Sequence, residues 1–237
     1  MTSSQATIYI RKAEERGEAD HGWLQSFHTF SFADYHDPRH MGFRSLRVIN
    51  DDTVRGGRGF DTHSHHNMEI VTYVIEGALR HKDSMGNSSV LEAGHVQRMS
   101  AGTGVTHSEY NHSEHDPVHF LQIWIRPQKE NIKPSYQEKV VEQNDGSSLQ
   151  LIGSPDGREN SLLIHQDVFL SIGRVPAGAQ LDYAVAKERG VWIQIVHGEV
   201  NIEGKLLNPG DGLSAEHVTS LNITALADSE FLLFDLA

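Results

Sequence analysis

The chain has 237 residues, which is enough for one or two domains with a hydrophobic core of their own. It contains no cysteine, so disulfide frameworks, thiolate metal sites and thiol nucleophiles are excluded, and any metal must be held by nitrogen and oxygen. Because the formal net charge is -12 and the lysines and arginines are scattered, we expect no direct nucleic-acid binding.

The sequence shows no segment that resembles a membrane span or a signal peptide. The first twenty residues, MTSSQATIYIRKAEERGEAD, contain no apolar core, and the longest apolar runs, such as FLLF at 231–234, are too short to cross a bilayer. We therefore expect a soluble cytoplasmic protein with no membrane role.

Strand signals dominate the chain. Short runs rich in Val, Ile, Phe, Tyr and Trp, bounded by Gly, Pro, Asn or Asp, predict strands at 45–51, 69–77, 118–127, 168–175, 190–204 and 230–236. Only residues 10–20 and 135–144 look weakly helical, and neither segment has an apolar stripe. Regular short strands with such turns predict an all-β fold of the sandwich or barrel type with little helix.

The chain divides into two β units. A polar stretch with two prolines at 126–139 and a loop at 153–160 indicate a connection, so we place the boundary between residues 138 and 139. The two units look like copies, because VTYVIEG (71–77) aligns with WIQIVHG (192–198), and each strand closes on a glycine that a hairpin follows.

Histidines gather where the strand of the first unit begins, in THSHHNMEIVTYVIEG (62–77). Side chains two apart on a strand share a face, so His63 and His65 form one pair, and His107 and Glu109 form another. Two such pairs on neighbouring strands of a barrel would bring four ligands to one point. Three imidazoles and a carboxylate suit Fe, Ni, Mn, Co, Cu or Zn and leave room for water or substrate.

Glu69 is the alternative fourth ligand, because it has the strand parity of His65. It could equally be an exposed strand residue or the partner of a histidine. We favour Glu109, which shares a strand face with His107. A storage-type double barrel, in which these histidines only form hydrogen bonds, is the structural alternative.

Other histidines and aromatic residues are interpreted as structural. We expect solvated surface or loop positions for five histidines, namely His66, His95, His112, His115 and His119. We expect core and lid packing for four aromatic residues near the N-terminus, namely Trp23, Phe27, Phe30 and Phe32.

The second unit has apolar residues where the first has candidate ligands. The strand alignment puts Ala184 and Ala186 in the places of His63 and His65. A looser alignment puts Ile223 and Ala225 in the places of the second pair, His107 and Glu109. The C-terminal unit is therefore expected to keep the architecture without metal ligands.

Three stretches of the N-terminal half, 22–52, 59–87 and 92–111, resemble the pirin family of the cupin superfamily, in particular bacterial pirin-like proteins described as quercetin 2,3-dioxygenases. The C-terminal half resembles the second, metal-free barrel of that family in outline. The resemblance implies a bicupin of two tandem double-stranded β-helix barrels, a metal-binding barrel over 1–138 and a barrel without ligands over 139–237. It also implies one divalent transition metal ion, with Fe the first expectation, held by His63, His65, His107 and Glu109.

The resemblance further implies a dioxygenase that cleaves the heterocyclic ring of flavonols such as quercetin with O2. In that reaction the metal would acidify and orient a substrate hydroxyl, and Glu109 would also act as the general base. Two alternatives stay open. One is a metal-binding regulatory protein that acts through a protein partner, and the other is an enzyme with the same metal and another aromatic substrate, since an apolar barrel accepts flat aromatics.

Overall fold

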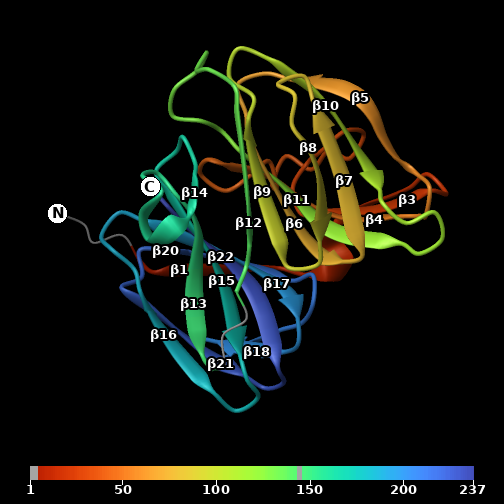
Figure 1. The fold of residues 1–237 in the computed structure, drawn as a ribbon. Coiled ribbons are helices and arrows are strands. Elements are labelled where there is room, and N and C mark those ends of the chain that lie inside the picture. Colours follow the sequence, from red (N-terminus) through yellow and green to blue (C-terminus); the bar gives the residue numbers. More distant parts are fainter. Residues whose placement is uncertain (1–4, 143–145) are drawn as a thin grey trace. The chain divides into compact units, whose positions relative to one another are not determined.

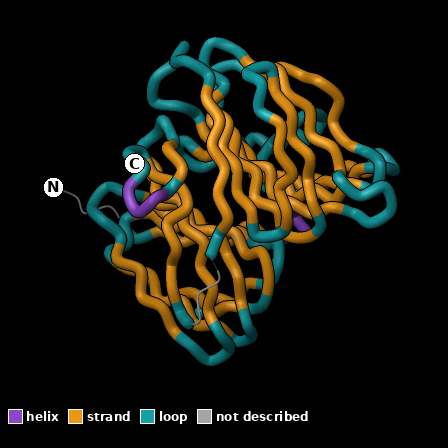
Figure 2. Tube along the Cα trace, in the orientation of Figure 1, coloured by secondary structure: helices purple, strands orange, loops and turns teal. Residues whose placement is uncertain are grey.

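The computed structural model describes residues 5–142 and 146–237, and strands dominate both halves of the chain (Figure 1). Strand accounts for 58% of the structure and helix for 3%, which confirms the predicted all-β fold. The helical parts of the described residues are two short 3-10 turns, η1 (Ala13–Glu15) and η2 (Arg158–Asn160), drawn in purple in Figure 2. No helix in the described ranges is long and apolar enough to span a bilayer.

The N-terminal compact unit comprises Gly17–Glu142 and Leu162–Gln166. Its larger sheet has the order β12-β9-β6-β11-β4-β3-β2 and its smaller sheet the order β5-β10-β7-β8, with antiparallel neighbours. The strands are β2 (Gly17–Asp20), β3 (Leu24–His28), β4 (Leu46–Val54), β5 (Gly59–His65), β6 (Glu69–Glu76), β7 (Ala78–Asp83), β8 (Ser88–Glu92), β9 (His95–Ser100), β10 (Val105–Asn111), β11 (Val118–Ile125), β12 (Ser135–Val140) and β14 (Leu162–Leu163).

The C-terminal compact unit comprises residues 5–16, 146–161 and Asp167–Ala237. Its strands run in the order β1-β20-β17-β22-β15-β13 in one sheet and β16-β21-β18-β19 in the other. They are β1 (Thr7–Arg11), β13 (Ser148–Ser154), β15 (Val168–Val175), β16 (Gln180–Ala184), β17 (Gly190–His197), β18 (Val200–Ile202), β19 (Lys205–Leu207), β20 (Gly212–Glu216), β21 (Ser220–Ala225) and β22 (Ser229–Leu236).

The sheet orders confirm the internal repeat. The order β9-β6-β11-β4 in the first unit corresponds to β20-β17-β22-β15 in the second, and β5-β10-β7-β8 corresponds to β16-β21-β18-β19. Ile223 and Ala225, which the sequence aligns with His107 and Glu109, are fully buried in the apolar core of the C-terminal unit. At these positions the C-terminal unit has the same fold, with apolar core side chains in place of the polar candidate ligands.

The compact units differ from the predicted division at residues 138 and 139. Residues 5–16 group with the C-terminal unit because β1 pairs with β20, and residues 139–142 group with the N-terminal unit because β12 pairs with β9. The weakly helical interpretation of 135–144 was wrong for Ser135–Val140, which is a strand, and residues 143–144 lie outside the described part. In 10–20, the single turn η1 lies between two strands. Edge pairing thus outweighs the helix propensity of Gln, Glu and Lys in β12.

A polar layer crosses the larger sheet of the N-terminal unit between two apolar clusters. On the inner face of β6, Thr72 lies between Ile70, which packs with Met99, and Val74, which packs with Phe120. Cross-strand pairing carries this layer over five strands, from β9 to β3, through Gln97, Thr72, Gln122, Asn50 and His28. The barrel interior is therefore apolar at both ends and polar in the middle.

Candidate metal centre and cavity

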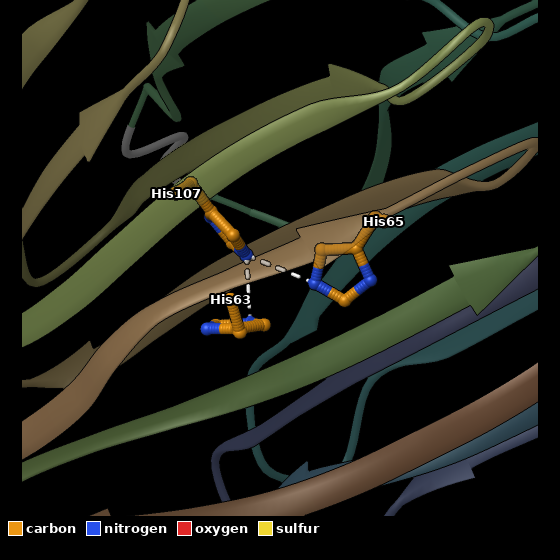
Figure 3. A group of neighbouring side chains, drawn as sticks. All are labelled: His63, His65 and His107. Carbon is orange, nitrogen blue, oxygen red and sulfur yellow. Dashed lines mark hydrogen bonds between the residues drawn. The ribbon is translucent and has the colours of Figure 1, made fainter.

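Three histidines converge inside the N-terminal barrel. Strands β5 and β10 are neighbours, with His63 opposite His107 and His65 opposite Val105. The Nε2 atom of His107 lies 3.0 Å from Nε2 of His63 and 3.0 Å from Nε2 of His65. Figure 3 shows the three rings pointing toward one another. The strands that carry the two predicted pairs, His63 with His65 and His107 with Glu109, are therefore neighbours.

The histidines are held in the form that can bind a cation. Nδ1 of His63 lies 2.8 Å from the carbonyl oxygen of Asp61, so its N–H donates there and leaves Nε2 with a lone pair. Burial first, and then the neighbouring histidines, lower the pKa of His65 to about 4 and the pKa of His107 to about 3. Both rings are therefore neutral near pH 7.

Glu109 lies two residues from His107 on β10 and is 2% exposed. Its Oε1 accepts hydrogen bonds from Gln97 Nε2 at 2.9 Å and Thr72 Oγ1 at 3.3 Å, and its Oε2 accepts one from Gln122 Nε2 at 2.8 Å. Burial raises the pKa of Glu109, while the histidines and the bond from Thr72 oppose this rise. The polar layer therefore holds the carboxylate in place beside the histidines.

The sequence missed His81, which lies opposite Glu109 on β7 and is fully buried. His81, His107 and Glu109 form a second group in which the ligand atoms lie within 4.8 Å of one another, and His107 also belongs to the group of His63 and His65. The Nδ1 atoms of His81 and His107 are buried without a hydrogen-bond partner among the described residues. The strand parity of His81 and Asp83 after the turn at Gly77 was the available signal.

A cavity of about 730 Å³ opens beside this group. His63, His65 and Glu109 line it, and its apolar walls include Trp23, Phe32, Phe60 and Trp124. Trp124 packs edge-on against both His65 and Phe32, with ring centroids 5.0 and 5.3 Å apart. Phe30 is buried and Trp23 packs against the core, as expected, and Trp23 and Phe32 also line the cavity. The volume suits a drug-sized aromatic molecule.

Glu69 does not join this site. It is 1% exposed, and its Oε2 accepts hydrogen bonds from Ser100 Oγ at 2.9 Å and from the backbone N–H of His165 at 3.1 Å. Since neighbours on a strand point to opposite faces, Glu69 leaves the sheet on the side opposite Ile70 and Thr72. The prediction of an exposed residue was wrong, and its histidine partner lies outside the candidate site.

The remaining histidines contrast with the inward group. His66, His112 and His115 are exposed, as expected, and His95 is half-buried. His119 is also half-buried, on strand β11, with Nε2 2.5 Å from Asp51 Oδ1.

Two tandem antiparallel barrels, the first with inward histidines beside a cavity, define a bicupin whose described residues include a candidate metal centre in the first barrel. Residues 9–125 match the Pirin family, and residues 151–236 match the family described as Quercetinase C-terminal cupin domain. The chain therefore belongs to the pirin family, which has the cupin fold.

Relatives support this assignment over nearly the full length. The chain is 51% identical over 229 residues to quercetin 2,3-dioxygenase from Escherichia coli (strain K12), with 97% of this chain and 98% of the relative covered. The crystal structure of YhhW from Escherichia coli superposes with a TM-score of 0.95 at 50% identity, covering 98% of both chains. A second structure, of bacterial pirin YhhW in complex with nickel(II), gives a TM-score of 0.94 at 50% identity, covering 97% of this chain and 99% of that one.

Proposed function

We propose that this chain is a metal-dependent dioxygenase that cleaves the heterocyclic ring of flavonols such as quercetin with O2. The observation that carries the proposal is the convergence of three imidazole Nε2 atoms beside an aromatic-lined cavity, two of whose lining residues are His63 and His65. The name of the 51% identical relative supports the same reaction.

The donor set fits a divalent transition metal ion. Metal–nitrogen bonds are about 2.0–2.1 Å long, so two Nε2 atoms 3.0 Å apart would subtend roughly 90° at an ion, an angle that neighbouring ligands adopt in octahedral sites. We propose His63, His65, His107 and Glu109 as the ligands. Iron was the first expectation from the sequence, and the nickel complex of a relative makes nickel an equal candidate.

The chain's own residues would bind and orient the substrate. When bound, the metal would supply Lewis acidity toward a substrate hydroxyl and orient the substrate against O2. The apolar walls at Trp23, Phe32 and Trp124 would hold a flat ring system and keep water from its faces. Glu109 is proposed to accept the hydroxyl proton on a carboxylate oxygen, while Gln97 and Gln122 keep that carboxylate in position.

The test is oxygen uptake with quercetin by metal-stripped protein reconstituted separately with Fe, Ni, Mn, Co or Cu. We expect uptake that requires a metal, disappears in His107→Ala and persists in His66→Ala, a matched control at an exposed histidine. Absence of uptake by protein that has bound each ion in stoichiometric amount would refute the proposed reaction.

A second candidate is an enzyme with the same metal and another aromatic substrate. The aromatic walls of the cavity recognise flat rings without selecting one ring system, which favours this alternative. Competition by other polyhydroxylated aromatics in the same oxygen assay would identify a better substrate. A regulatory role through a protein partner stays a prediction from the sequence.

A further inference from the structure

Four buried polar side chains line the same cavity on strands β3 and β4, and we call them the β3–β4 polar cluster. Its members are Ser26, His28, Asn50 and Asp52. Ser26 is the cross-strand partner of Asp52, and His28 is the partner of Asn50. None of the four is more than 4% exposed. Burying polar groups costs free energy unless they form hydrogen bonds, so this cluster on an inner wall requires an explanation.

Within the cluster, the two β4 side chains, Asn50 and Asp52, each accept a hydrogen bond from β3 on one oxygen. The Ser26 hydroxyl donates to Asp52 Oδ1. Nδ1 of His28 lies 2.9 Å from Asn50 Oδ1, and because that oxygen can only accept, the ring N–H donates. These bonds orient both side chains of β4 from the neighbouring strand.

The other polar atoms of the two β4 side chains remain available. Asp52 Oδ2 and Asn50 Nδ2 have no hydrogen-bond partner among the residues that the structure describes. Asp52 Oδ2 and Asn50 Nδ2 are not among the side-chain atoms that are fully buried without a hydrogen-bond partner. Because both side chains line the cavity, these two atoms are open to it. An acceptor and a donor thus lie on one face of β4, two residues apart.

Such a pair matches a phenolic hydroxyl, which donates one hydrogen bond and can accept another. We propose that the β3–β4 polar cluster is a second recognition site in the cavity, where Asp52 and Asn50 bind a phenolic hydroxyl of the aromatic substrate away from the histidines. This inference rests on the proposed function for the identity of the ligand.

The position of the β3–β4 polar cluster fits a ligand that reaches from this cluster to the side chains around Glu109. The side chains that hold Glu109 come from β9, β6 and β11, centred on β6, whereas the polar cluster is centred between β4 and β3. With strands about 4.8 Å apart, two and a half spacings put the two centres at most about 12 Å apart. A flat molecule of two or three rings can reach both, with its faces against the aromatic walls.

The test measures flavonol binding to metal-free protein by quenching of tryptophan fluorescence, without turnover. The ligands are quercetin, the analogue without hydroxyls on its pendant ring, and the analogue without hydroxyls on its fused benzene ring. The variants are Asp52→Asn and Asn50→Ala. The matched control is Glu92→Gln, which removes an exposed carboxyl on β8 that does not line the cavity.

We expect Asp52→Asn and Asn50→Ala each to weaken quercetin binding by about 10-fold. Binding of one of the two analogues should be nearly insensitive to the same substitutions, because it lacks the hydroxyl that the cluster recognises. Glu92→Gln should leave all three affinities within about twofold.

The outcomes separate this inference from the proposed function. If wild-type protein binds quercetin, but Asp52→Asn weakens all three ligands equally or none of them, the recognition site is refuted while the dioxygenase proposal stands. If wild-type protein binds none of the flavonols, either metal-free or after metal loading, the substrate assignment fails and the recognition site fails with it. Circular dichroism of each variant checks that the barrel has folded.

Discussion

Substitution of Asp52 should also change how the stability of this protein depends on pH. Burial, partly offset by the hydrogen bond from Ser26, raises the pKa of Asp52 from its usual 3.8 to about 7, and the charges of Asp51 and Glu109 contribute to the rise. In the unfolded chain the same carboxyl is solvated and titrates near its usual value. Replacing it with Asn keeps the shape and removes the titration.

The sign of the effect follows from proton binding. Between about pH 4 and pH 7, the folded protein holds a proton at Asp52 that the unfolded chain has lost. The free energy of unfolding therefore falls by about 1.4 kcal/mol for each pH unit, or about 4 kcal/mol over the three units. This stabilisation is complete below the unfolded-state pKa and is lost as the pH rises through the folded-state pKa.

Urea denaturation of metal-free wild type and Asp52→Asn at half-unit steps from pH 5 to pH 8 measures this effect. The variant's free energy of unfolding should rise relative to wild type by about 2–3 kcal/mol between pH 5 and pH 7 and then level off. Asp34→Asn provides the comparison for the loss of an exposed carboxyl. A difference between Asp52→Asn and wild type that is constant over this range would show that burial of Asp52 does not set its protonation.

Three further predictions concern the turn at Gly77, the hydrophobic core of the C-terminal unit and the carboxylate of Glu109. Gly77→Ala should cost about 1–3 kcal/mol of stability, because φ there is +76° and an added Cβ would lie 2.7 Å from a backbone oxygen. Gly86→Ala, at φ +97° with nothing nearby, isolates the conformational part in the same urea experiment. Ile223→Ala should lower the free energy of unfolding by about 2–5 kcal/mol, because it leaves a cavity in the second core, while metal content measured by elemental analysis stays unchanged. Glu109→Gln should keep part of the bound metal and depress oxygen uptake, and undiminished turnover would contradict its role as proton acceptor.

Local patterns were sufficient to predict several of the strands and to pair the candidate ligands on shared strand faces. The parity of a strand depends only on backbone geometry, so residues 63 and 65, like residues 107 and 109, had to share a face once each segment was a strand. Glycine turns and β-branched runs are equally local, and they predicted β4, β6, β11, β15, β17 and β22. The internal repeat was readable for the same reason, because both copies use the same succession of strands and turns.

Long-range pairing decided the rest of the candidate site. Gln97 and Asp52 carry no distinctive local motif. Gln97 reaches Glu109, and Asp52 reaches the cavity, because β9 and β4 occupy particular places in the larger sheet. The sequence also could not show on which side of the sheet Glu69 lies. Both faces of β6 are buried, so strand parity does not identify the face that turns toward the barrel interior. Segment 135–140 became a strand only through pairing with β9.

The amino-acid sequence by itself thus determined the all-β architecture, the repeat and the candidate ligand pairs, because these depend on neighbours along the chain. The tertiary structure alone decided which buried polar side chains join the histidines around the cavity. Hydrogen bonding across strands and burial from water act between residues that are distant in the sequence, and their effect on a carboxyl or an imidazole appears only when the barrel closes around it.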